Sequence, residues 1–196
     1  MTKGSETRQA EYPIDPIFLD RWSPRAMSGE AMTPEEIMPL FEAAKWAPSS
    51  YNNQPWRILY ARRGTAHWEK FLGLLGEGNR QWAQHGAVLL VFVSKTTFDH
   101  NGKPSVTHSF DTGAAWENLA LQGSRKGWVI HGMEGFDFAR AKKELNVPDG
   151  FNVEAMAVIG KPGRKETLSA DMQAREKPSD RRKVAESFFE GAFPQA

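Results

Sequence analysis

Two guanidinium groups and a hydroxyl group lie close together near the N-terminus, in the segment Arg21-Trp22-Ser23-Pro24-Arg25, called here the arginine element. If its backbone is extended, Arg21, Ser23 and Arg25 point to the same side. Arginine makes bidentate, charge-assisted hydrogen bonds to phosphate, so this spacing suits a grip on an anion. The competing interpretation is a solvated surface turn, because charged runs are usually exposed.

A second polar segment, residues 48–54, begins at a proline and is followed by another, and is called here the serine loop. Its serine, asparagine and glutamine side chains donate and accept hydrogen bonds without titrating. The pyrimidine edge of a flavin, with alternating C=O and N–H groups, needs such a neutral lining. The alternative is an ordinary polar loop that follows a helix.

Two further segments are less specific. Residues 132–135 read Gly-Met-Glu-Gly, and such glycines allow backbone amides to approach a ligand closely. Residues 181–183 read Arg-Arg-Lys, which is usually a solvated run.

Together these segments resemble the FMN-dependent nitroreductase family. Residues 48–56 read Pro-Ser-Ser-Tyr-Asn-Asn-Gln-Pro-Trp, which matches the family's Pro-Ser-Ser-x-Asn-x-Gln-Pro-Trp in full. The arginine element is similar to the family's opening element, except that Trp22 stands where arginine or histidine is common. Trp22 carries no charge, although its indole N–H can donate, so the phosphate of FMN would depend more on Arg21 and Arg182.

The resemblance implies an FMN site at the interface of a homodimer, with the serine loop reaching the flavin from one subunit and the arginine element from the other. Arg25 is the expected catalytic residue, because a fixed cation near the flavin N1–C2=O region stabilises the reduced state. Arg21 and Arg182 would neutralise the phosphate, and Ser23 would donate to it. The cofactor-binding residues expected by resemblance are Arg21, Trp22, Ser23, Arg25, Pro48, Ser49, Ser50, Asn52, Gln54, Asn79, Met133, Glu134, Gly135, Arg181 and Arg182.

The resemblance also implies an activity. NADPH or NADH would give hydride to the flavin and leave, and a small electron-poor acceptor such as a nitroaromatic or a quinone would take its place, a ping-pong scheme. Two alternatives stay open: a flavin-binding protein for storage or sensing, and an enzyme of the same fold with different chemistry, such as dehalogenation or flavin fragmentation.

Helices and strands must position these groups. Thr33-Pro34-Glu35-Glu36 predicts a helix start with a capping box, and the helix must end near Ala47 because the following proline disfavours helical geometry. The near-continuous apolar run over 87–94 predicts a strand buried on both faces. Residues 111–126 predict a buried helix whose small residues near Gly113 permit close packing.

The pattern predicts further helices over 15–20, 65–75, 79–85 and 137–145, and strands over 56–61, 128–132 and 153–159. This is an α+β chain with helices flanking a mixed or antiparallel sheet. The resemblance makes it a three-layer fold in a domain-swapped dimer. Residues 1–19 are an expected N-terminal extension and residues 20–196 a single domain. The aromatic tail with Phe188, Phe189 and Phe193 either lies over the chain's own sheet or reaches a partner subunit.

Composition argues against other classes. A net charge of +1 argues against a nucleic-acid or membrane-surface binder, and the longest apolar run, Ala87–Val93, is too short to span a bilayer. The absence of cysteine removes thiolate and iron–sulfur chemistry, and the five histidines lack metal-ligand spacing. The N-terminal residues lack the apolar core of a secretory signal, so a cytoplasmic location is expected.

Overall fold

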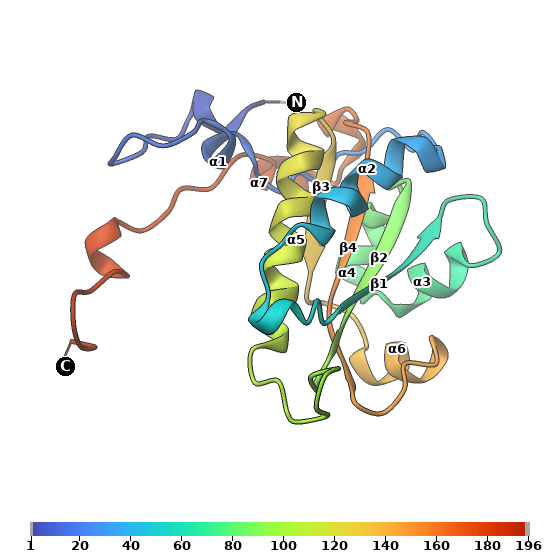
Figure 1. Cartoon of the computed structure of the whole chain (residues 1–196). Coiled ribbons are helices and arrows are strands. Elements are labelled where there is room, and N and C mark those ends of the chain that lie inside the picture. The colour runs from blue at the N-terminus through green and yellow to red at the C-terminus, as the bar shows by residue number, and fades with distance from the viewer. Residues whose placement is uncertain (1, 195–196) are drawn as a thin grey trace.

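The computed structural model describes residues 2–194 and places a four-stranded sheet between two layers of helices (Figure 1). The strands are β1 (Trp56–Arg62), β2 (Val88–Lys95), β3 (Val129–Met133) and β4 (Phe151–Gly160). Their order across the sheet is β1-β2-β4-β3, and each neighbouring pair is antiparallel. The predicted three-layer α+β fold is confirmed, and of the two sheet types allowed by the sequence the chain forms the antiparallel one.

The helices cover both faces of this sheet. Helices α2 (Pro34–Lys45) and α5 (His108–Arg125) pack on one face, and α3 (Trp68–Leu74), α4 (Glu77–Ala83) and α6 (Phe138–Glu144) pack on the other. The short helices are α1 (Ile17–Asp20), α7 (Ala170–Arg175) and four 3-10 turns, Gly4–Glu6, Ser50–Asn52, Lys165–Thr167 and Val184–Glu186. Helix α7 was not predicted. No helix within residues 2–194 is long and apolar enough to cross a bilayer.

Strand β2 is the centre of the core. Val88, Leu90 and Phe92 join the hydrophobic cluster beneath α2 and α5, while the alternating residues between them join the cluster beneath α3, α4 and α6. Because successive side chains of a strand point to opposite faces, a strand covered on both sides must be apolar at every position. This confirms the strand predicted from the run over 87–94.

The start of α2 also follows the sequence pattern. The Thr33 side chain accepts a hydrogen bond from the Glu36 backbone N–H at 3.4 Å, and a Glu36 carboxylate oxygen accepts from the Thr33 N–H at 2.8 Å. This reciprocal pair satisfies two donors that the first helical turn leaves free. Ile37, Leu40 and Ala44 are buried along the face that meets the sheet.

Within the described chain, helix α5 packs closely against its neighbours at Gly123 and not at Gly113. A Cβ atom added at Gly113 would meet nothing within 4 Å, so no part of the described chain packs closely there. At Gly123, near the other end of α5, an added Cβ would lie 2.4 Å from Ile130 Cγ1. The backbone of α5 therefore approaches β3 at Gly123, whereas Gly113 faces outward.

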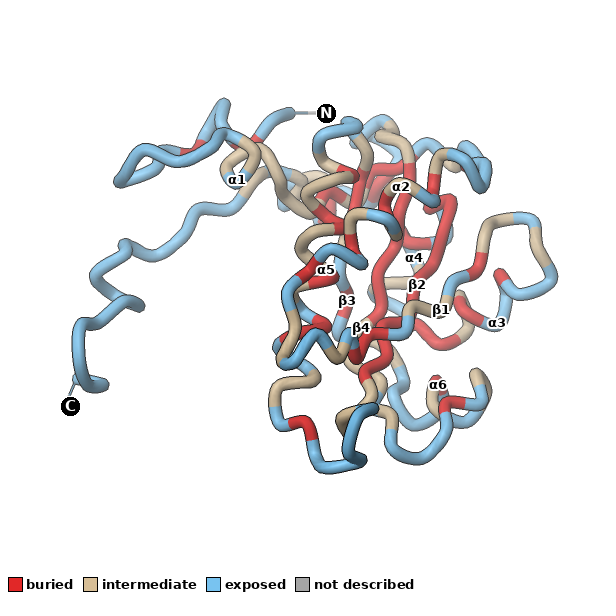
Figure 2. Tube along the Cα trace, in the orientation of Figure 1, coloured by how far each residue is buried: buried red, intermediate tan, exposed pale blue. Residues whose placement is uncertain are grey.

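The C-terminal segment leaves the body of the molecule (Figure 1). Phe188 and Phe193 are 74% and 87% exposed, and the segment is exposed along nearly its whole length from residue 179 onward (Figure 2). Of the two alternatives for the aromatic tail, the one that folds it over the chain's own sheet is not realised.

Candidate functional site

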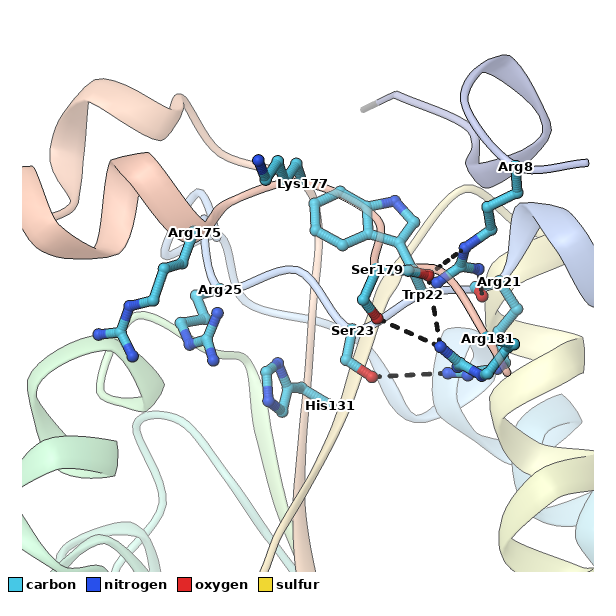
Figure 3. Close-up of a pocket in the computed structure, with 10 residues that line it drawn as sticks. All are labelled: Arg8, Arg21, Trp22, Ser23, Arg25, His131, Arg175, Lys177, Ser179 and Arg181. Carbon is cyan, nitrogen blue, oxygen red and sulfur yellow. Dashed lines mark hydrogen bonds between the residues drawn. The ribbon is translucent and has the colours of Figure 1, made fainter. Parts of the chain in front are cut away.

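All the charged and hydroxyl side chains of the arginine element line one pocket of about 250 Å³ (Figure 3). Arg21, Trp22, Ser23 and Arg25 form part of its wall. The other lining residues are Arg8, His131, Arg175, Lys177, Ser179 and Arg181. This arginine pocket therefore gathers side chains from the N-terminal segment, from β3 and from the C-terminal segment.

Backbone hydrogen bonds hold the arginine element against the sheet. The Gly163 N–H donates to the Ala26 carbonyl at 2.9 Å, and the Ser28 N–H donates to the Lys161 carbonyl at 3.0 Å. His131 on β3 contacts the Pro24 carbonyl through Nδ1 at 2.8 Å. The element is thus fixed to the end of β4 and to the edge strand β3.

Arg8 ties the termini to this pocket. Its guanidinium donates to the carbonyl oxygens of Ser179, Leu19 and Arg21, each at 2.8 Å. Burial, followed by the nearby charges of Arg181 and Arg21, lowers the pKa of Arg8. Arg8 joins three separate segments and adds to the positive charge of the pocket.

His131 is neutral at physiological pH. Burial lowers its pKa to about 4, the charge of Arg25 acts in the same direction, and the hydrogen bond to Pro24 opposes the shift. Because a carbonyl oxygen only accepts, the neutral ring must carry its proton on Nδ1 and donate to Pro24. The ring also lies 4.4 Å from the Trp82 ring, centroid to centroid.

The indole N–H of Trp22 has its hydrogen-bond partner outside the arginine pocket. Its indole N–H donates to the Thr2 carbonyl at 2.8 Å, so its expected contribution as a donor is directed to the N-terminal segment. Arg21 instead lies 3.4 Å from Glu117 on α5 and within 3.5 Å of the Ser23 hydroxyl.

The serine loop lies apart from the arginine pocket. It sits beside the N-terminal end of α5, whereas α1 and the arginine element lie toward the other end of that helix (Figure 1). The Ser50 backbone N–H donates to the Asp111 carboxylate at 3.0 Å, and the Ser49 hydroxyl accepts from the Gln54 N–H at 3.0 Å. Pro48, Ser49, Ser50, Asn52 and Gln54 contribute nothing to the pocket lining.

Left-handed backbone conformations mark the same loop. Tyr51, Asn52 and Gln54 have φ values of 52°, 53° and 48°. Such values are uncommon for residues other than glycine and cost on the order of 1–3 kcal/mol each, so they persist where the surroundings or the function require them.

The glycine segment lies at the end of β3 and meets α4. The Asn79 side-chain amide donates to the Gly135 carbonyl at 3.1 Å, and a Cβ atom at Gly135 would lie 2.8 Å from Asn79 Nδ2. Met133 and Glu134 line a second, largely apolar pocket of about 300 Å³ together with Phe92, Trp116 and other residues. Both pockets therefore flank β3, the edge strand of the sheet.

The basic run contributes one residue to the arginine pocket. Arg181 lines it and donates through Nη1 to the Ser179 hydroxyl at 3.2 Å. Arg182, the residue expected at the phosphate, lines a different cavity with residues 9–12 of the N-terminal segment. Of the two arginines expected to bind the cofactor, Arg181 lines the arginine pocket and Arg182 does not.

Sequence reasoning missed half of the pocket's lining. Arg8 falls in the expected N-terminal extension, and Arg175, Lys177 and Ser179 fall in a stretch without a recognisable pattern. Their convergence depends on long-range contacts that local spacing does not reveal. His131 could have been suspected from its position on a short apolar strand directly before the glycine segment.

Comparisons with known proteins agree with this geometry. Residues 19–161 match the model of the nitroreductase family. A Streptomyces coelicolor protein, whose name assigns it provisionally as an NADH dehydrogenase or NAD(P)H nitroreductase, is 25% identical over 169 residues, which cover 76% of this chain and 85% of that protein.

Solved structures are similar over a longer span. A crystal structure described as an oxidoreductase containing FMN is 48% identical, with a TM-score of 0.94 and full coverage of both chains. A Desulfovibrio desulfuricans protein, provisionally assigned as a nitroreductase and solved with FMN, is 24% identical with a TM-score of 0.70, covering 94% of this chain and 100% of that one. At 24% identity, the similarity to the Desulfovibrio desulfuricans protein shows a shared fold.

Proposed function

Since the chain belongs to the nitroreductase family, we propose that it is an FMN-dependent NAD(P)H oxidoreductase that reduces small electron-poor acceptors such as nitroaromatics and quinones. The observation that carries the proposal is the arginine pocket at the edge of β3, where side chains suited to bind phosphate meet from three segments.

The donor set of the pocket fits a phosphate monoester. Arg8, Arg21 and Arg181 gather at one end of the pocket with the hydroxyl groups of Ser23 and Ser179 (Figure 3). Guanidinium and hydroxyl donors are the groups that recognise phosphate oxygens. No adenine-dinucleotide fingerprint occurs in the sequence, which supports FMN over FAD.

The rest of the flavin would extend along β3 from this end of the pocket. Arg25 lies at the opposite end (Figure 3), where it would face the pyrimidine edge and stabilise negative charge there. Asn79 and Gly135, held together by their hydrogen bond, would contact the ring at the end of β3. When bound, FMN would accept hydride from NADPH or NADH and pass it to the acceptor.

The serine loop would act in a second copy of the chain. Its side chains lie outside the arginine pocket, although the family motif that they match is a flavin-binding one. A homodimer in which the loop of one subunit reaches the pocket of the other would bring the two together. The exposed Phe188, Phe189 and Phe193 of the C-terminal segment and the open face at Gly113 support such a partner.

The first test identifies the cofactor and its turnover. We expect the purified protein to be yellow and to release FMN on denaturation, as shown by chromatography. We expect NADPH or NADH to bleach the bound flavin under anaerobic conditions, and a quinone or nitroarene to restore its colour at a catalytic rate. Released FAD would contradict the cofactor assignment. Bound flavin that bleaches without reoxidation by any acceptor would favour a storage role.

A further inference from the structure

Glu176, directly after α7, holds the backbone of the arginine element. One of its carboxylate oxygens, Oε1, accepts hydrogen bonds from the backbone N–H groups of Arg25 at 2.7 Å and Ala26 at 2.8 Å. The side chain of Glu176 is only 5% exposed. A buried carboxylate with two backbone donors is a fixed anchor, so the C-terminal segment determines where Arg25 lies.

The same carboxylate places a negative charge beside Arg25. Its other oxygen, Oε2, lies 3.9 Å from Arg25 Nη1 and has no hydrogen-bond donor within residues 2–194. A buried charge is screened less than an exposed one, so it opposes part of the positive field that Arg25 projects into the pocket.

Of the remaining cations of the pocket, Arg21 is paired with Glu117 on α5, and the others make no ion pair within residues 2–194. None of the ten lining side chains is acidic. Arg175 and Lys177 lie at the same end of the pocket as Arg25 (Figure 3), and neither makes an ion pair within the described chain. Arg175 therefore adds a positive charge to this end that no carboxylate within the described chain offsets.

We propose that Glu176 is a positioning residue for Arg25 with two separable roles. Its Oε1 fixes the backbone of Arg25, and its charge offsets part of the charge of Arg25, so that Arg175 adds to the positive field at this end of the pocket. The inference rests on the proposed function, because it takes this end to face the pyrimidine edge of FMN.

A conservative substitution separates the two roles. Glu176→Gln retains a side-chain carbonyl oxygen that can accept from both backbone N–H groups, but it removes the negative charge. Glu176→Ala removes both. Arg175→Ala removes a positive charge from the same end without touching the anchor. Glu166→Gln, an exposed carboxylate in the same segment, serves as the matched control.

The midpoint potential of the bound flavin tests the charge role. In the FMN-loaded protein, we expect Glu176→Gln to favour the reduced flavin by threefold to tenfold, a rise of about 15–30 mV for two electrons. Arg175→Ala should shift the potential by a similar amount in the opposite direction, and Glu166→Gln should leave it unchanged. An unchanged or lowered potential for Glu176→Gln would overturn the charge role, because a purely structural residue would give that result.

Amide hydrogen exchange tests the anchoring role, and it does not need the flavin. We expect the Arg25 and Ala26 amides, followed by NMR, to exchange at least tenfold faster in Glu176→Ala and near the wild-type rate in Glu176→Gln. Equal rates in all three proteins would overturn the anchor. If Glu176→Ala does not fold while Glu176→Gln does, the anchor is supported. A wild-type protein that binds no FMN would refute the proposed function while this measurement still decides the anchor.

Discussion

The arginine element and the serine loop match parts of the same family pattern, yet their side chains differ in how many contacts they make within the chain. The arginine element is held by His131 and Glu176, and the residues directly after it bond to the chain just beyond the end of β4. Its side chains meet others in a pocket. The serine loop is anchored through Ser50 to Asp111 and through Asn53 to Thr97 and Asp99. The Ser50 hydroxyl and the Asn52 side-chain amide make no hydrogen bond within residues 2–194.

This difference supports the proposed division of the site between two chains. A polar side chain that is kept exposed on a strained backbone is expected to have a partner outside the chain. The side chains of the arginine pocket meet one another within the chain. The Ser50 hydroxyl and the Asn52 side-chain amide lie outside this pocket and make no hydrogen bond within residues 2–194, which is the state expected of groups that meet a ligand held by a second copy.

A mixed dimer gives the largest effect that this comparison predicts. One subunit would carry Arg21→Ala and Arg181→Ala, and the other Ser50→Ala and Asn52→Ala. We expect each homodimer to lose FMN, whereas the mixed dimer, isolated through two affinity tags, regains one FMN per dimer because one of its sites is intact. Flavin absorbance per protein measures this.

The same dimer distinguishes the alternative. If the loop and the pocket of one chain served one site, both sites of the mixed dimer would be damaged, and no FMN would return. Mixed dimers of each variant with the wild-type chain serve as controls. They should bind one FMN per dimer whether the loop and the pocket of a site come from one chain or from two.

The two arginines of the arginine element should differ in their effects. Losing a buried charge-assisted partner costs about 2–3 kcal/mol, or roughly thirtyfold to a hundredfold in an equilibrium or rate constant. We expect Arg21→Ala to weaken FMN binding by this factor and to leave the reduction rate per bound flavin nearly intact. Arg25→Ala should slow flavin reduction by a similar factor and weaken binding only moderately.

Flavin dissociation constants and stopped-flow reduction rates separate these outcomes. Arg164→Ala provides a control, because Arg164 is exposed, lies outside the pocket and, within residues 2–194, forms an ion pair only with Glu166. Equal effects of Arg21→Ala and Arg25→Ala on both quantities would show that Arg21 and Arg25 do not have separate roles in binding and in reduction.

The fold could be predicted because its signals are local. The capping box at Thr33, the proline that ends α2 and the apolar run of β2 each lie within one element, and each forms as expected. The serine loop could also be recognised, because its motif is contiguous in the sequence. Close packing near Gly113 could not be judged, since it depends on what covers α5 from outside.

The arginine pocket was only half predictable for a physical reason. Arg8 and Ser179 are 171 residues apart, and a hydrogen bond joins them. Glu176 and Arg25 are 151 residues apart. Such pairs carry no periodicity and no spacing rule, so only the three-dimensional fold reveals them. The same cause explains why sequence spacing could not decide which of Arg181 and Arg182 lines the pocket.

The next largest expected effect is the part of the pH dependence of folding stability that comes from His131. Its pKa falls from 6.5 to about 4 on folding, so the unfolded chain binds the proton more readily than the native one. Stability is therefore fully present above pH 6.5 and is lost as the pH falls toward 4, by about 2 kcal/mol at pH 5. Urea unfolding of wild type and His131→Asn from pH 7 to 4.5 measures this. A pH profile as steep in the variant as in wild type would exclude His131 as the cause.

The substitution Gln54→Gly should give the smallest effect. It should raise the stability of the FMN-free protein and lower its affinity for FMN. Gln54 has a φ of 48°, which is in the left-handed region, and it precedes Pro55, which restricts its backbone further. Gln54→Gly removes this strain, and after the entropy that glycine adds to the unfolded chain we expect the FMN-free protein to be stabilised by about 1 kcal/mol. FMN binding should weaken, because the side-chain amide proposed to meet the flavin is lost. Lys103→Ala, a change of an exposed side chain in the loop that follows β2, controls for general effects of a surface substitution. Lower stability in Gln54→Gly would show that the loop's conformation is not strained, and stronger FMN binding would show that the side chain has no part in the site.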